Sequence, residues 1–275
     1  MKKKSFGIIG SPIAHSLSPV LHNYWFKKYN IEANYSLLNI TEENLKNVID
    51  KIKNKELSGI NVTLPYKQKI IPYIDKLVND AKSTNSVNTI FLDGSNSLIG
   101  ENTDVYGLQA GYLKKIGDTE NKKVLIIGAG GVSPSVIFAL KKSKIKNISI
   151  INRTHDKSIF LKKRFNFLKI LEWGSLEDEL ANFDIIINAT SLGLKNSNDF
   201  EFKFERVKQS LIYIDTIYNP LQTKMIKHLK AKNIKTFNGL DMLIYQGQKS
   251  FYIWHKVNPE VDEELINLLE NKLLS

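Results

Sequence analysis

A glycine-rich turn almost halfway along the chain constrains this sequence more than any other feature. Gly128, Ala129, Gly130 and Gly131 follow an apolar, strand-like run at 124–127 and lead into a helical pattern. Glycines at this spacing let the backbone turn tightly and approach a pyrophosphate, which N–H groups of the following helix then hold. The turn therefore predicts a dinucleotide site. About a hundred residues precede it, too many for a leader, so we expect a separate, substrate-carrying domain before it.

The composition indicates a globular protein with two domains. A chain of 275 residues can build two cores of ordinary size. Apolar residues make up 42% and charged residues 24% of the sequence, and no apolar run approaches the length of a membrane span. The apolar segment near the start is too short for a signal peptide, which favours a cytoplasmic protein. The absence of cysteine excludes disulfides and thiolate metal sites.

The net charge of +11 does not predict a nucleic-acid partner. The only arginines are Arg153, Arg164 and Arg206, and the lysines are scattered among Asn, Ile and Glu. Proteins that read nucleic acid rely on arginine and on clustered basic patches. We therefore interpret the lysines as a solvated surface that can also attract anionic ligands.

Alternating strand and helix patterns predict an α/β fold throughout. Helical patterns separate the later strands, which predicts a parallel, doubly wound Rossmann domain at 106–239. We expect a substrate domain at 1–105, which the C-terminal helices at 240–275 complete. Ser18 and Thr41 are the predicted N-caps of two early helices. The expected strands lie at 6–9, 35–38, 59–64, 87–92, 98–100, 124–127, 148–151, 184–188, 211–214 and 234–237. The expected helices lie at 19–29, 42–53 and 240–274, the last with a break at 258–259.

The loop after the second Rossmann strand predicts which cofactor is bound. Enzymes that use NAD place an acid about 20 residues beyond the glycine turn to bind the ribose 2′-hydroxyl. Here Asn152, Arg153 and Thr154 occupy that region, with Lys157 nearby. Arginine can fork onto phosphate oxygens and stack on an adenine, so this loop favours NADP with its 2′-phosphate. Asp156 is a minor argument for NAD, and Ser133 stands where a third glycine is common.

The segment at 10–23 carries hydroxyls and two histidines between a strand and a helix start. Ser16 and Ser18 can donate hydrogen bonds to a carboxylate, with help from the helix dipole. Ser18 could alternatively only cap the helix. His15 and His22 have no third candidate ligand nearby, so we predict no metal site.

A second polar cluster predicts the acid–base chemistry. Lys67 closes the stretch 61–67 at a strand end, where ligand clefts form in α/β sheets, and Asp104 closes the stretch 100–104. A lysine positioned by a carboxylate can transfer a proton, provided that its pKa is brought towards neutrality. Taken singly, Lys67 could be a solvated side chain and Asp104 a helix cap.

Nine ordered segments across essentially the whole chain resemble the shikimate dehydrogenase family. They are GSPIAHSLSPVLHN, NVTLPYK, SVNT, GENTD, GAGGVS, NRT, NATSLG, DTIYNP and GLDMLIYQG. The resemblance implies a substrate domain followed by a dinucleotide domain. It also implies reversible NADPH-dependent reduction of 3-dehydroshikimate to shikimate, a small-molecule substrate, in aromatic amino-acid biosynthesis, by a monomer or homodimer.

The resemblance also implies a role for individual residues. Lys67 becomes the acid–base residue, paired with Asp104. The carboxylate ligands become Ser16 and Ser18, assisted by Tyr218, and the hydroxyl ligands become Asn61, Thr63, Asn88, Asp104 and Gln246. The expected NADP ligands are Gly128, Ala129, Gly130, Gly131, Val132, Asn152, Arg153, Thr154, Lys157, Thr216 and Gly239. Three positions depart from the family pattern, namely Ser86, Thr216 and Asp241.

Three alternatives stay open at the level of sequence. A quinate/shikimate dehydrogenase shares the fold and the Lys–Asp pair, and can use NAD. A short-chain dehydrogenase needs a Tyr-x-x-x-Lys pair, which Tyr24 with Lys28 and Tyr252 with Lys256 both match, although the glycine motif of that class is absent. A metabolite-sensing or nucleic-acid-binding module on the same scaffold would bind ligand without turnover.

Overall fold

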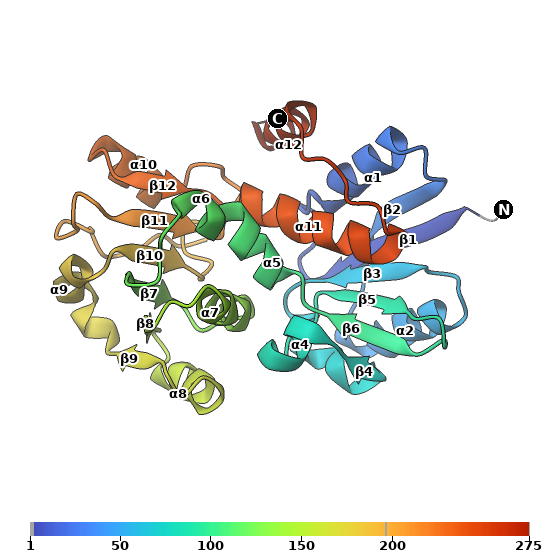
Figure 1. Cartoon of the computed structure of the whole chain (residues 1–275), viewed down its shortest axis with the longest axis horizontal. Helices are drawn as coiled ribbons and strands as arrows, with labels where there is room; N and C mark the ends of the chain where they lie inside the picture. Colours follow the sequence, from blue (N-terminus) through green and yellow to red (C-terminus); the bar gives the residue numbers. More distant parts are fainter. Residues whose placement is uncertain (1–2, 196, 275) are drawn as a thin grey trace. The chain divides into compact units, whose positions relative to one another are not determined.

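A computed structural model of the chain describes residues 3–195 and 197–274 (Figure 1). The chain forms two compact units, which are Met1–Gly107 with Ile244–Ser275 (unit 1) and Leu108–Leu243 (unit 2). Each unit contains a sheet covered by helices, which confirms the predicted two-domain α/β fold. The chain passes from unit 1 to unit 2 after Gly107 and returns to unit 1 after Leu243. The sequence predicted these domain boundaries at 105/106 and 239/240.

The sheet of unit 1 is mostly parallel and has the order β2-β1-β3-β5-β6-β4. The strand β1 pairs in parallel with β2 and β3, β5 runs antiparallel to both β3 and β6, and β4 pairs in parallel with β6. The strands are β1 (Lys4–Gly10), β2 (Ala33–Asn39), β3 (Gly59–Val62), β4 (Lys76–Leu77), β5 (Thr89–Leu92) and β6 (Leu98–Glu101).

Two apolar layers cover this sheet. On one face, Leu45, Val48, Ile49 and Ile52 of α2 pack against Ile9 and its neighbours, as their helical spacing predicts. On the other face, Phe6 meets aromatic rings of α1 and α11. The helices are α1 (Ser18–Lys28), α2 (Leu45–Lys53), α3 (Tyr66–Lys69), α4 (Asn79–Thr84), α5 (Asp104–Leu108), α11 (Leu240–His255) and α12 (Glu263–Leu274), with 3-10 turns at Glu42–Asn44 and Ile71–Tyr73.

Unit 2 is a doubly wound parallel sheet in the order β12-β11-β10-β7-β8-β9. The chain order reverses between β7 and β10, and such a switch point is where open α/β sheets bind ligands. Its strands are β7 (Lys123–Ile127), β8 (Asn147–Ile151), β9 (Lys169–Leu171), β10 (Ile185–Asn188), β11 (Ile212–Asp215) and β12 (Lys235–Phe237). Its helices are α6 (Lys114–Ile116), α7 (Ser133–Lys142), α8 (His155–Arg164), α9 (Leu176–Glu179) and α10 (Lys224–Ala231), with 3-10 turns at Trp173–Ser175 and Leu180–Asn182 and a π-helical turn at Gln109–Leu113.

The predicted N-cap Ser18 was wrong, whereas Thr41 occupies the N-cap position of the 3-10 turn that leads into α2, without a side-chain cap bond. Leu17 occupies the N-cap of α1, which places Ser18 inside the helix, and no side chain caps that end. Thr41 precedes a 3-10 turn, and its hydroxyl accepts a hydrogen bond from the amide of Asn44 and none from the backbone. The hydroxyl of Ser18 is therefore not needed for capping.

No helix in residues 3–195 or 197–274 is both long enough and apolar enough to cross a bilayer.

Candidate active site

The topology of unit 1 brings most of the predicted substrate residues to one edge of its sheet. The strands β1, β3 and β6 run in the same direction, and β5 runs against them. The segments that follow β1, β3 and β6 therefore meet the segment that precedes β5. These segments carry Ser16 and Ser18, Thr63 and Lys67, Asp104, and Asn88, respectively.

A buried ion pair lies at this edge. The Nζ atom of Lys67 lies 2.6 Å from Oδ2 of Asp104, and the two residues are only 8% and 5% exposed. The other carboxylate oxygen accepts a hydrogen bond of 2.8 Å from the amide of Asn88. The interpretations of Lys67 as a solvated side chain and of Asp104 as only a helix cap were therefore wrong. A lysine held in this way can exchange a proton with a bound oxygen atom.

The neighbouring predicted ligands also lie in unit 1. The amide of Asn88 is 3.4 Å from Oε1 of Gln246, on α11. Thr63 packs beside Gly10, where an added Cβ would come within 2.4 Å of its methyl group, so the glycine makes room for the threonine. Asn61 is 3% exposed and donates to the carbonyl of Asn88.

The two serines at the start of α1 contact each other. The hydroxyl of Ser16 donates to that of Ser18 across 3.3 Å, and the backbone N–H of Ser18 donates to Ser16. Tyr218 belongs to unit 2, so its assistance to these serines stays a prediction.

The glycine turn of unit 2 lies at the switch point of the sheet, after β7. Gly128 has a φ of +110°, and an added Cβ would lie 2.6 Å from a methyl carbon of Thr190, so this position requires glycine. The hydroxyl of Ser133 donates to the carbonyl of Gly128 across 2.9 Å. Ser133 thus ties the turn together from the position where a third glycine is common.

The rest of the turn leaves space for a ligand. A Cβ at Gly130 would meet only the carbonyl oxygen of Ala189, at 3.8 Å. The following Gly131 and Val132 lead into α7, whose N-terminal end has no side-chain cap. The backbone N–H of Ala129 donates to the side chain of Asn152, which links the turn to the end of β8. The side chain of Asn152 therefore helps to hold the glycine turn in place.

The cations beyond β8 are available to a ligand. Arg153, Thr154 and Lys157 are exposed. The side chains of Arg153 and Lys157 form no hydrogen bond or ion pair with another residue in the described ranges. An unpaired guanidinium and ammonium beside a glycine turn suit a phosphate group.

Thr216 and Gly239, two of the predicted NADP ligands, pack together beyond the ends of β11 and β12. The N–H of Gly239 donates to the carbonyl of Ile217, and an added Cβ on Gly239 would lie 2.3 Å from the carbonyl oxygen of Thr216. The hydroxyl of Thr216 donates to the backbone of Asn188 across 2.9 Å. Thr216 thus replaces the usual apolar residue with one that joins the ends of β10 and β11.

Asp241 and Ser86, the other two positions that depart from the family pattern, differ in their contacts. The carboxylate of Asp241 forms an ion pair of 2.8 Å with Lys115 within unit 2. The hydroxyl of Ser86 is fully buried and has no hydrogen-bond partner among the described residues.

The tyrosine–lysine pairs of the short-chain dehydrogenase alternative serve other purposes. The phenol of Tyr24 donates to Asp262, and Lys28 forms ion pairs with Asp262 and Glu260, which ties α1 to the segment before α12. Lys256 donates to a backbone carbonyl of its own helix end. Neither pair is arranged for proton transfer.

The histidines do not form a metal centre. His15 is exposed, whereas His22 is fully buried among aromatic rings, and burial lowers its pKa to about 3. Within residues 3–195 and 197–274, no group of three or more His, Cys, Asp or Glu side chains could hold a metal ion.

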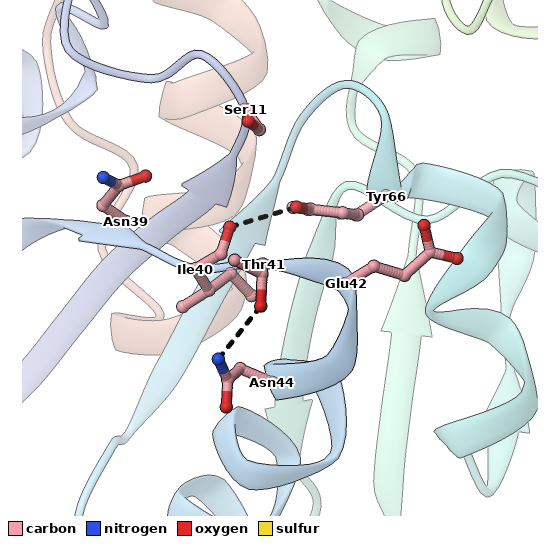
Figure 2. A pocket seen from close by; sticks show the side chains of 7 residues that line it. All are labelled: Ser11, Asn39, Ile40, Thr41, Glu42, Asn44 and Tyr66. Carbon is pink, nitrogen blue, oxygen red and sulfur yellow. Dashed lines mark hydrogen bonds between the residues drawn. The ribbon is translucent and has the colours of Figure 1, made fainter.

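A separate pocket opens beyond the ends of β1 and β2 (Figure 2). The phenol of Tyr66 points across it to the carbonyl of Ile40, and Asn44 bonds to Thr41. The lining residues are Ser11, Asn39, Ile40, Thr41, Glu42, Asn44 and Tyr66, and none of them belongs to the predicted substrate or cofactor sets.

Sequence reasoning missed part of the polar cluster in unit 1. Tyr35 and Ser250 are buried within hydrogen-bonding distance of Asn61, and neither residue was predicted. A helical signal for Ser250 existed, because it follows Gln246 by four residues on α11 and so lies on the same face.

Unit 2 has a glycine turn at the switch point of its sheet, and unit 1 has a buried lysine–carboxylate pair. Together these features define a two-domain α/β dehydrogenase. Family models agree with this class. The "Shikimate dehydrogenase substrate binding domain" matches residues 8–90, and "Shikimate / quinate 5-dehydrogenase" matches residues 112–238. The chain belongs to the shikimate dehydrogenase family, which confirms the resemblance seen in the sequence.

Individual relatives are similar over nearly the whole chain. A shikimate dehydrogenase (NADP(+)) of Pelagibacter ubique is 46% identical, with 98% of this chain and 99% of that protein covered. A crystal structure of shikimate dehydrogenase from Aquifex aeolicus is 33% identical with a TM-score of 0.89, covering 99% of this chain and 98% of that one. A shikimate dehydrogenase solved in complex with NADP+ is 38% identical with a TM-score of 0.89, covering 99% and 95%.

Proposed function

We propose that this chain catalyses the reversible NADPH-dependent reduction of 3-dehydroshikimate to shikimate, a step of aromatic amino-acid biosynthesis. The buried pair of Lys67 and Asp104 carries the proposal, because it places a proton donor at the edge where the substrate ligands gather. Family membership supports the choice of substrate, since a fold alone would not specify it.

The substrate is held at two ends in this proposal. Ser16 and Ser18 donate hydrogen bonds to its carboxylate, with Tyr218 as a further donor. The hydroxyls of the ring meet Thr63, Asn88, Asp104 and Gln246. The resemblance also puts Asn61 among the hydroxyl ligands, but this amide already bonds within the protein.

Proton transfer falls to Lys67. NADPH, when bound, supplies a hydride to the C3 carbonyl carbon of 3-dehydroshikimate. The ammonium of Lys67 gives a proton to the carbonyl oxygen, which becomes the hydroxyl of shikimate. Asp104 holds the ammonium in place and accepts a hydrogen bond from the substrate. Fixing these groups near their reacting atoms can contribute about 7 to 11 kcal/mol in favourable cases.

NADP is the proposed cofactor. The glycine turn at 128–131 and Val132 approach the pyrophosphate, and Arg153 with Lys157 binds the 2′-phosphate, with Asn152 and Thr154 completing the loop. Thr216 and Gly239 lie near the nicotinamide in this proposal. The unpaired, exposed state of both cations supports it.

A rate comparison tests the function. Purified protein is mixed with shikimate and NADP, and separately with quinate and NAD, while reduced-nicotinamide absorbance is followed. We expect shikimate with NADP to be turned over far faster than any other pairing, with or without a chelator. Faster turnover of quinate would favour the quinate/shikimate alternative, and ligand binding without turnover would favour a sensing module.

We further propose that the enzyme works in the cytoplasm as a monomer or homodimer and binds no nucleic acid. Light scattering at several protein concentrations separates the two oligomeric states. Binding of duplex DNA at physiological salt would contradict the last point.

A further inference from the structure

A chain of buried hydrogen bonds in unit 1 leads to the Lys67–Asp104 pair. It begins at Tyr35 and passes through Asn61. It ends at Asn88, which donates to Asp104. Every member is at most 5% exposed. Tyr35 and Ser250, which flank Asn61, have no part in the proposed chemistry.

Tyr35 has a fixed orientation and a fixed direction of donation. Its phenol donates to Oδ1 of Asn61 across 2.8 Å. Its ring is stacked on that of His22, with centroids 4.4 Å apart and an angle of 3° between the planes. Burial holds the pKa of Tyr35 well above its usual value, so the phenol keeps the proton that it donates.

The N–H groups of Asn61 are fully engaged within the protein. Its oxygen accepts from Tyr35. Its two N–H groups face three acceptors, which are the carbonyl of Asn88 at 2.9 Å, the hydroxyl of Ser250 at 3.0 Å and that of Thr89 at 3.1 Å. Because an amide has only two N–H groups, none is left for a substrate hydroxyl.

Ser250 helps to fix the amide of Asn88. Its hydroxyl lies 2.8 Å from that of Thr89 and 3.1 Å from that of Thr103. Thr89 and Thr103 both contact the oxygen of Asn88, and the backbone N–H of Thr103 donates to the same oxygen across 2.7 Å. With its oxygen held from this side, Asn88 must turn its N–H groups towards Asp104.

We propose that Tyr35, Asn61 and Ser250 are positioning residues, which orient Asn88 and through it the Lys67–Asp104 pair. Asn61 therefore acts through Asn88 and not as a substrate ligand. The inference rests on the proposed function, since it assigns how the groups of that site are aligned.

A double-mutant cycle on kcat/KM for shikimate tests the assignment. Tyr35→Phe removes one hydroxyl and should lower kcat/KM about tenfold, a loss within the range that coupled residues show. Asn88→Ala removes the group being positioned. If Tyr35 acts through Asn88, adding Tyr35→Phe to Asn88→Ala should cause little further loss of kcat/KM, although the Tm still falls.

Tyr29→Phe is the matched control. It removes a phenol oxygen that accepts from the backbone of Glu260, in the same unit but outside the polar chain. We expect it to lower Tm without changing kcat/KM. Equal effects of Tyr35→Phe and Tyr29→Phe on kcat/KM, or additive losses in the cycle, would overturn the assignment. Additive losses for Asn61→Ala with Asn88→Ala would make Asn61 an independent ligand.

A measurement without substrate separates this inference from the proposed function. In NMR spectra, Tyr35→Phe and Ser250→Ala should each shift the side-chain amide signals of Asn88, whereas Tyr29→Phe should not. Unmoved Asn88 signals would refute the positioning role even in an active enzyme. Shifted signals in an enzyme that does not turn over shikimate would refute only the proposed function.

Discussion

The two units differ in how far the side chains of their proposed ligand sites are already fixed by bonds within the protein. In unit 1, Lys67 and Asp104 are buried and already bonded to each other. In unit 2, the turn at Gly128 is shaped by backbone, and the side chains of Arg153 and Lys157 stay exposed, with no partner in the described ranges. The proposed substrate site is thus assembled from fixed side chains, whereas the proposed cofactor site combines a fixed turn with exposed cations.

The difference follows from the tasks of the two sites. Proton transfer requires donor and acceptor atoms to be held in near-contact, so a buried and fully bonded cluster is advantageous. Phosphate recognition depends on charge and on backbone N–H groups, and a long side chain can move to meet the anion. Single substitutions should therefore affect chemistry in unit 1 and affinity in unit 2.

The largest expected effect is on Lys67. Lys67→Ala should lower kcat by about two to four decades, the usual range for a positioned acid–base group, with little change in the Kd for shikimate. Asp104→Asn should impair both quantities, and the double variant should lose less than the sum of the two. Steady-state kinetics and calorimetric binding measure these terms. A Lys67→Ala enzyme with undiminished kcat would remove the proton-transfer role.

Arg153→Asp should affect affinity for one cofactor. The loss of a charge-assisted phosphate contact is typically worth about 1.5 to 3 kcal/mol, so NADP should bind one to two decades more weakly. NAD has no 2′-phosphate and should be much less affected. Fluorescence titration with each cofactor measures the change. Equal losses for both would show that Arg153 lies away from the 2′-phosphate.

Acidification should change the stability of the two units in opposite directions through one buried group in each. Burial lowers the pKa of His22 to about 3, so between its usual 6.5 and that value only the unfolded chain takes up the proton, and unit 1 loses stability as pH falls. Burial raises the pKa of Asp215, in unit 2, from 3.8 to about 6, so the folded state takes up a proton first and gains stability. At about 1.4 kcal/mol per pKa unit, His22 costs roughly 2 kcal/mol by pH 5.

Calorimetry between pH 7 and pH 5 measures this contrast. The fall in Tm on acidification should be smaller in His22→Phe than in the wild type and larger in Asp215→Asn. Identical pH dependence in all three proteins would show that neither group titrates as its surroundings indicate.

The smallest expected effect concerns two buried serines, one in each unit. Ser86→Ala removes a hydroxyl that has no partner in the described structure, so stability should rise by up to about 1 kcal/mol. Ser133→Ala removes a hydroxyl that is bonded to Gly128, so stability should fall. Urea unfolding of both variants compares them. A less stable Ser86→Ala would mean that this hydroxyl finds a partner in solution.

The sequence predicted the long elements well because their periodicity was strong, and it missed the short ones. It missed β9, since three residues at a sheet edge carry no usable pattern, and β4 for the same reason. In the site, the motifs located Lys67 and Asp104. Nothing local indicated Tyr35, and only its helical spacing from Gln246 pointed to Ser250. Those two residues reach Asn61 of β3 only in the tertiary structure, Tyr35 from β2, on the other side of β1, and Ser250 from α11.

Unit 1 is built from two stretches of chain, and the second follows the whole of unit 2. A ribosome therefore releases all of unit 2 before Ser250 and Phe251, which fill the interior of unit 1, have emerged. Nascent domains usually fold in order from the N-terminus. Here the later unit can be completed first, while Phe6 and Trp25 of the earlier unit lack the α11 rings that cover them in the finished fold.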